Sequence, residues 1–100
     1  MKLTPKKVYE NHINNHLEKK TALEQLTSLI ENSDDIGVRL ESIKIIGELE
    51  ILSNKSFNLL ENLLISDSSE DIRIAAAEML RTNFIDRAFE PMKWALQHES

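Results

Sequence analysis

The sequence of 100 residues contains no cysteine, which excludes disulfides, thiolate metal sites and a cysteine nucleophile. Two glycines and two prolines are too few for the many turns of an all-β protein, and they suit long helices. Aromatic residues make up 5% of the chain against 41% hydrophobic residues, so a core would be aliphatic. No apolar run approaches the roughly 20 residues that span a bilayer, and the polar N-terminus lacks a signal-peptide core. We therefore expect a cytoplasmic protein without a membrane partner.

The charge is unevenly distributed along the chain. The first 20 residues hold five lysines against Glu10 and Glu18, a balance of +3, whereas the rest holds seven basic and fifteen acidic groups, a balance of −8. Because phosphate neutralisation needs clustered Lys and Arg, the acidic body argues against nucleic acid as the principal ligand. Solvated lysines at a chain end explain the basic start, although contact with an anionic surface stays open.

One stretch of the chain occurs twice. Residues 38–46 and 72–80 share a β-branched residue before an arginine, a small residue three positions after the arginine, and a large apolar residue four positions later. The two arginines, Arg39 and Arg73, are 34 positions apart, and an acidic or hydroxyl-rich turn precedes each copy. Self-similarity with a period in the thirties is typical of stacked helical repeats.

The apolar periodicity predicts an all-α protein of about six helices. Thr4 fits the N-cap and Pro5 the first turn of a first helix that continues to about Lys20 and covers the open end of the stack. The expected divisions are a capping helix (1–20), a first repeat (21–52), a second repeat (53–85) and the first helix of an incomplete third repeat (86–100).

Polar segments predict where the other helices begin. Thr21 to Glu24 and Ser68 to Asp71 have capping-box spacing, while Ser33 to Asp35 and Ser53 to Ser56 offer N-cap side chains. Gly47 lies inside a predicted helix, which suggests close approach of a neighbouring helix or a slight kink. The helix after Ser53 has a wide apolar stripe and is expected to make contacts on both sides: Phe57, Leu59, Leu60, Leu63, Leu64 and Ile65.

These residues resemble HEAT repeats, a family in the armadillo-like class. The carriers of the resemblance are Asp67, Ile72-Arg73, Ala76 and Leu80 in one copy, and Val38-Arg39, Ser42 and Ile46-Gly47-Glu48-Leu49 in the other. The resemblance implies an α-α superhelix, a right-handed solenoid of helical hairpins. It also implies that the motif arginines tie adjacent repeats to acidic turns: Arg39 and Arg73, with Asp35, Asp67 or Asp71 as acceptors. By analogy with the family, the second helices line a concave side that receives the partner, with these side chains outward: Glu41, Lys44, Glu48, Glu78 and Arg81.

Few residues suggest chemistry. His12 and His16 share a helix face but lack the neighbouring ligands of a zinc site. The single His98-Glu99 pair resembles the iron ligands of HEAT-like hydroxylases, without the repeated pairs that such a site needs. We therefore predict no catalytic residue, no cofactor-binding residue, no metal site and no cofactor.

The leading hypothesis is a non-catalytic scaffold or adaptor that binds a protein or peptide. An accessory unit of a HEAT-like lyase or hydroxylase is the alternative, and binding of a nucleic-acid backbone through the basic first helix is a weaker one. Self-association through the last predicted helix also stays open, because Phe89, Met92 and Trp94 would form an apolar patch.

Overall fold

The computed structural model describes residues 2–84, and this part of the chain is helical without any strand. The predicted all-α fold is confirmed. The described helices are α1 (Pro5–Ile13), α2 (Lys19–Asn32), α3 (Ile36–Glu48), α4 (Asn54–Ser66) and α5 (Glu70–Asn83). The sixth helix predicted for residues 86–100, and the apolar patch on it, lie outside the described residues.

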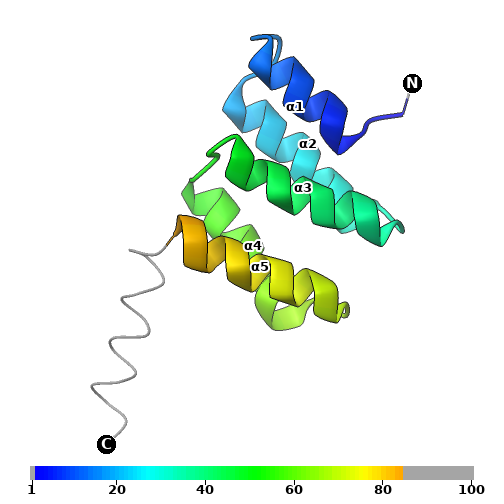
Figure 1. Cartoon of the computed structure of the whole chain (residues 1–100), viewed down its shortest axis with the longest axis vertical. Helices are drawn as coiled ribbons and strands as arrows, with labels where there is room; N and C mark the ends of the chain where they lie inside the picture. Colours follow the sequence, from blue (N-terminus) through cyan, green and yellow to red (C-terminus); the bar gives the residue numbers. More distant parts are fainter. Residues whose placement is uncertain (1, 85–100) are drawn as a thin grey trace, which may run out of the picture.

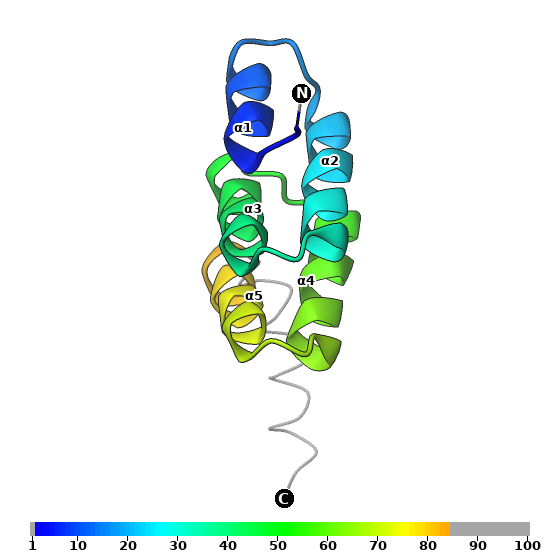
Figure 2. The same cartoon turned by 90° about the vertical axis from the view of Figure 1, so that its right-hand side faces the viewer.

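The helices lie in two rows. Figure 2 shows α1, α3 and α5 in one row and α2 and α4 in the other. The helices α2 and α3 run antiparallel as a first hairpin, and α4 and α5 repeat the arrangement as a second hairpin (Figure 1). Because α1 packs against both α2 and α3, it covers one end of the first hairpin. The two hairpins therefore stack as a short helical solenoid.

The core is aliphatic and runs through both hairpins. Its fully buried large apolar side chains come from all five helices: Val8, Leu26, Ile30, Ile43, Ile46, Leu60 and Ile72. Phe57 and Phe84 add a tilted aromatic contact, with ring centroids 5.6 Å apart. A single hairpin could not bury these side chains alone, so stacking supplies much of the stability of each hairpin.

The helix caps show that the two hairpins share one register. The Asp35 carboxylate accepts hydrogen bonds from the backbone N–H groups of Gly37 and Val38 at the start of α3. The Ser69 hydroxyl accepts one from Ile72 at the start of α5. These two N-caps are 34 positions apart, as are the first residues of α3 and α5, so the predicted period is confirmed. Thr4 and Ser53 also cap helices as predicted.

Three predicted helix boundaries are wrong. The first helix ends at Ile13 rather than near Lys20, because Asn14 closes it and Asn15 adopts a left-handed backbone conformation with φ of 62°. The next helix begins at Lys19, so Thr21 lies inside it instead of capping it.

The third wrong boundary is the start of α5, where Ser69 rather than Ser68 is the N-cap. The Asp67 carboxylate accepts a hydrogen bond from the backbone N–H of Ser69 at 3.0 Å. This local turn leaves the Ser69 hydroxyl free to cap the helix.

Gly47 marks a close approach of two helices, which is one of the two expectations for this position, the other being a slight kink. A Cβ atom built on Gly47 would lie 2.5 Å from Sδ and 2.9 Å from Cε of Met79 on α5. The helix α3 therefore packs against α5 at a position where an added side chain would have to displace the end of the Met79 side chain.

The apolar stripe of α4 is narrower than predicted. Leu60 and Leu63 are buried, but Leu64 is exposed and Ile65 is 72% exposed. Ile30, 34 positions before Leu64, is fully buried in the first hairpin. Leu64 belongs to the last hairpin that the structure describes.

Candidate interaction surfaces

Arg39 connects the two hairpins. Its Nη2 donates to Asp67 Oδ1 at 2.5 Å and its Nη1 to Asp67 Oδ2 at 3.3 Å, across 28 positions of sequence. Its Nε donates to the carbonyl of Ile30 at 2.6 Å, near the end of α2. The Arg39 and Asp67 side chains are only 16% and 11% exposed. The guanidinium thus links the last turn of α2 to the turn between α4 and α5 by a bidentate ion pair.

The ion pair controls the protonation of Asp67. Hydrogen bonds from Arg39 hold the pKa of the Asp67 carboxyl below its usual value of 3.8. Burial opposes this shift, while the backbone N–H of Ser69 and the charges of Arg39 and Arg73 support it. Asp67 is therefore an anion with three favourable neighbours, Arg39, Ser69 and Arg73, and it accepts hydrogen bonds from both hairpins.

Within the described residues, Arg73 has a related role with fewer hydrogen bonds. Its Nη1 donates to the backbone carbonyl of Asp67 at 2.7 Å, at the end of α4. Each motif arginine therefore bonds a carbonyl at the C-terminal end of the first helix of its own hairpin, where a cation is favourable. Among the described residues, only Arg39 also reaches a carboxylate in the next hairpin.

The other two predicted acceptors lie elsewhere. Asp35 caps α3 within its own hairpin, and Asp71 is exposed in the first turn of α5. No hydrogen bond joins either carboxylate to Arg39 or Arg73, although both arginines lie in the described chain.

The five predicted partner-binding residues lie together on the α1–α3–α5 row. Glu41, Lys44 and Glu48 line a shallow depression of about 360 Å³ between α1 and α3. Lys44, Glu78 and Arg81 line a second one of about 310 Å³ between α3 and α5. All five are exposed, and Lys44 Nζ lies 3.8 Å from Glu48 Oε1 in an i,i+4 ion pair. Their placement makes one continuous surface of mixed charge.

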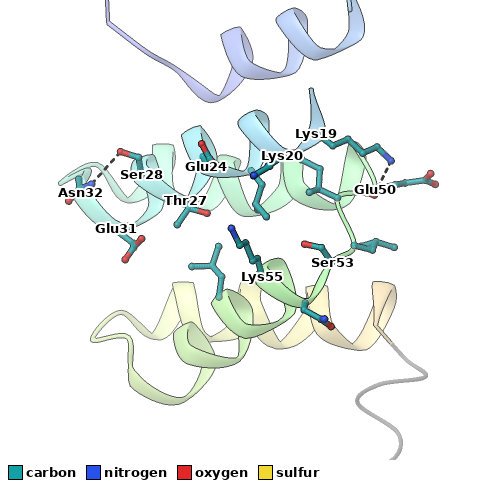
Figure 3. A pocket seen from close by; sticks show the side chains of 15 residues that line it. Lys19, Lys20, Glu24, Thr27, Ser28, Glu31, Asn32, Glu50, Ser53 and Lys55 are labelled. Atoms are coloured by element: carbon teal, nitrogen blue, oxygen red, sulfur yellow. Dashed lines mark hydrogen bonds between the residues drawn. The ribbon is translucent and has the colours of Figure 1, made fainter. Parts of the chain in front are cut away.

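A larger groove lies on the opposite row, between α2 and α4, and the sequence interpretation missed it. Its volume is about 930 Å³, and Figure 3 shows side chains from both helices around it. Apolar side chains contribute to its lining: Leu23, Ile51, Leu52 and Leu59. Lys20 and Lys55 line it from opposite helices. Leu52, an apolar residue directly before the polar segment that begins at Ser53, could have indicated this groove, but that segment was interpreted only as the start of a helix.

The candidate metal residues do not converge in the described part of the chain. His12 Nδ1 lies 2.7 Å from the carbonyl of Leu17, so its ring closes the turn after α1 and is partly buried. His16 is exposed. No group of three potential metal ligands occurs among residues 2–84, and the pair His98-Glu99 lies outside them. The described helices include none long and apolar enough to cross a membrane.

Comparison with known proteins identifies the family. A family model described as HEAT repeats matches residues 13–100. No curated protein and no solved structure matches the chain. The matched region includes both hairpins, the two motif arginines and the Asp67 turn. The chain therefore belongs to the HEAT-repeat family.

Proposed function

We propose that the chain is a non-catalytic protein-interaction module that binds its partner on the α1–α3–α5 row. HEAT repeats generally mediate contacts between proteins, which supports this class of function. The contact residues would be those that line the two shallow depressions: Glu41, Lys44, Glu48, Glu78 and Arg81.

The packing of the two rows supports the choice of face. The helix α3 packs directly on α5, with Gly47 against Met79, whereas α2 and α4 are separated by the large groove. A stack whose helices approach closely in one row and separate in the other curves toward the close row. On this argument the α1–α3–α5 row is the concave side, which can surround a partner.

The mixed charge of the surface indicates what kind of partner it would suit. Two basic and three acidic side chains alternate over neighbouring helices, and all of them are exposed. Such a surface favours a polar protein segment with complementary charges over a uniformly anionic polymer. The observation that carries the proposal is the gathering of these five side chains on one row.

The test is a pull-down with charge-reversed variants. Because the proposal places the module in the cytoplasm, tagged protein is incubated with a soluble lysate of the source cells. The retained partner is identified, purified and titrated against the chain. We expect Lys44→Glu/Arg81→Glu to weaken binding at least tenfold, since both cations lie in one depression.

A matched control is available on the opposite row. Lys20→Glu/Lys55→Glu makes the same change in net charge on the α2–α4 row. We expect this variant to retain the partner and to have the circular dichroism spectrum of the wild type. Unchanged binding by Lys44→Glu/Arg81→Glu, or equal loss in both variants, would contradict the assignment of the face.

A further inference from the structure

We infer that the groove between α2 and α4 is a second binding surface, for a peptide segment with acidic residues beside aliphatic ones. The groove lies on the row opposite to the proposed partner surface, so this inference does not depend on the proposed function. It is also the larger space, at about 930 Å³ against 360 and 310 Å³ for the two depressions. Binding sites for small molecules occupy about 300–1,000 Å³, so the groove has room for several side chains.

Two of the three lysines that line the groove have no ion-pair partner among the described residues. The side-chain ammonium groups of Lys20 on α2 and Lys55 on α4 form no hydrogen bond or ion pair within residues 2–84. Figure 3 shows Lys55 extending from α4 toward the wall that carries Lys20. Lys19, near one end, donates instead to the backbone carbonyl of Glu50 at 3.3 Å. A carboxylate bound between the two helices could pair with either ammonium group.

The acidic side chains of the lining do not fill that place. Figure 3 shows the carboxylate of Glu24 directed away from α4, and Glu31 and Glu50 at opposite ends of the groove. The middle is therefore bordered by two ammonium groups and by the hydroxyl group of Thr27, while the Ser53 hydroxyl is engaged with Ser56 as the N-cap of α4. This arrangement is complementary to an anionic side chain with hydrogen-bond acceptors.

Apolar side chains supply the second part of the recognition. Leu52 is 46% exposed just before α4 begins, and Leu59 is half-buried on α4, seven positions later. Leu23 and Ile51 are buried beneath them. An aliphatic side chain next to the bound carboxylate would cover Leu52 and Leu59, and burial of apolar area would contribute to affinity.

The same features favour a protein segment over nucleic acid. The groove has three lysines but also three glutamates in its lining, and the chain has a net charge of −5. A phosphate backbone requires a run of cations without interspersed carboxylates, whereas a peptide can place one or two acids between the lysines.

The test uses displayed random 12-residue peptides as the probe. Peptides are selected on the wild-type chain, synthesised with a fluorophore, and titrated by anisotropy against wild type and variants. We expect selected peptides to contain Asp or Glu next to Leu, Ile or Val. Lys20→Glu/Lys55→Glu should weaken their binding at least tenfold, while Lys44→Glu/Arg81→Glu on the other row should leave it within twofold.

A second pair of variants tests the apolar part. Leu52→Ser should weaken the same peptides about threefold or more, whereas Ile65→Ser, which removes a 72% exposed side chain outside the groove, should not. Both positions are exposed, so wild-type thermal melting is expected and checks the fold. The two charge-reversed double variants affect different rows. If the groove binds no such peptide, the proposed function of the α1–α3–α5 row is unaffected, and the reverse also holds.

Three results would overturn the inference. The first is a selection that enriches no acidic–aliphatic sequence, or peptides that bind Lys20→Glu/Lys55→Glu as tightly as wild type. The second is a 20-base-pair DNA duplex that binds tighter than every selected peptide and loses binding with the same variant. The third is a dimer in analytical ultracentrifugation that this variant converts to monomer, because the groove would then belong to a second copy.

Discussion

The two hairpins share a motif but use it differently. Arg39 in the first hairpin bonds a helix-end carbonyl and also the carboxylate of Asp67 in the second hairpin. Arg73, at the equivalent position 34 residues later, bonds the carbonyl of Asp67. The turn residue that receives the guanidinium is Asp67 in the second hairpin, whereas Ser33 stands at the equivalent position in the first.

In this chain the motif arginine of the first hairpin bonds the turn of the following hairpin. Asp67 is needed because Arg39 precedes it, one repeat earlier in the chain. The printed sequence has no arginine before Arg39, so no motif arginine from an earlier helix can donate a hydrogen bond to the turn at Ser33. This interface between repeats therefore depends on two residues in different hairpins. Mutations at the two equivalent positions should then reduce the free energy of unfolding by different amounts.

The largest effect is expected for Arg39→Met, which keeps an apolar stem but removes the guanidinium. The variant leaves the mostly buried Asp67 carboxylate without its main partner and the Ile30 carbonyl without its donor. We expect the free energy of unfolding to fall by about 3 kcal/mol, the lower end for breaking a buried ion pair. Urea denaturation followed by circular dichroism measures this. Arg81→Met, at an exposed position of α5, is the control and should change stability by less than about 0.5 kcal/mol.

The next effect is expected at the contact between α3 and α5. Gly47 in the first hairpin and Arg81 in the second occupy equivalent positions, 34 residues apart. Met79 of α5 lies against Gly47, whereas Arg81 is exposed. Gly47→Leu should cost about 2 kcal/mol, since the added side chain must displace Met79. Thermal unfolding monitored at 222 nm would show a lower Tm. An unchanged Tm would mean that α3 and α5 are not in contact at this point.

Asp67→Ser places the turn residue of the first hairpin into the second. The serine can still accept from the backbone of residue 69, as Ser33 accepts from Asp35 at 3.1 Å. The ion pair with Arg39 is lost, and we expect a cost of about 1.5–3 kcal/mol at pH 7, the range for a hydrogen bond to a charged group.

The pH dependence of this cost has a definite sign. The folded-state pKa of Asp67 lies below its usual value of 3.8, so its charged form stabilises the fold above that pH. The stabilisation is lost as pH falls through the folded-state pKa. The difference in stability between wild type and Asp67→Ser should therefore be constant from pH 7 to about 5 and should shrink below pH 4. A constant difference down to pH 2 would exclude the ion pair as its cause.

Arg73→Met should have a smaller effect than Arg39→Met, although the sequence motif around the two arginines is the same. The variant removes one hydrogen bond to the backbone carbonyl of Asp67, and it removes the positive charge of Arg73 near the Asp67 carboxylate. We expect a cost of about 1 kcal/mol in urea denaturation. Equal costs for the two arginine variants would contradict the unequal roles of the two positions.

The sequence predicted the features that depend on periodicity. The 34-residue spacing predicted the hairpins and the equivalent positions of Arg39 and Arg73, and a glycine inside a predicted helix suggested a close approach or a kink at Gly47. It could not tell which of three acids meets each arginine, because Asp35, Asp67 and Asp71 all lie in acidic turns. Asp35 turned out to be a cap because its carboxylate lies beside the free N–H groups of α3.

The interaction surfaces show the same limit. Helical periodicity places Glu41, Lys44 and Glu78 on the outward side of their helices, which the structure also shows as exposed. The groove between α2 and α4 depends instead on how far two helices separate after stacking. On the other row α3 packs on α5, with Met79 over Gly47, and no local pattern in α2 or α4 encodes such a long-range arrangement.

The smallest effect is expected for Ser33→Asp, the reverse of the exchange at Asp67. An aspartate at residue 33 can keep the hydrogen bond from the backbone N–H of Asp35, as Asp67 does for Ser69. It gains no arginine, because Arg39 is engaged with Ile30 and Asp67. The added charge also lies at the C-terminal end of α2, beside Asp34 and Asp35, where an anion is unfavourable. We expect a loss of no more than about 0.5 kcal/mol in urea denaturation, against the several-fold larger loss for Asp67→Ser. A gain in stability would mean that Arg39 exchanges between the two turns, and the forward direction of the motif would then be wrong.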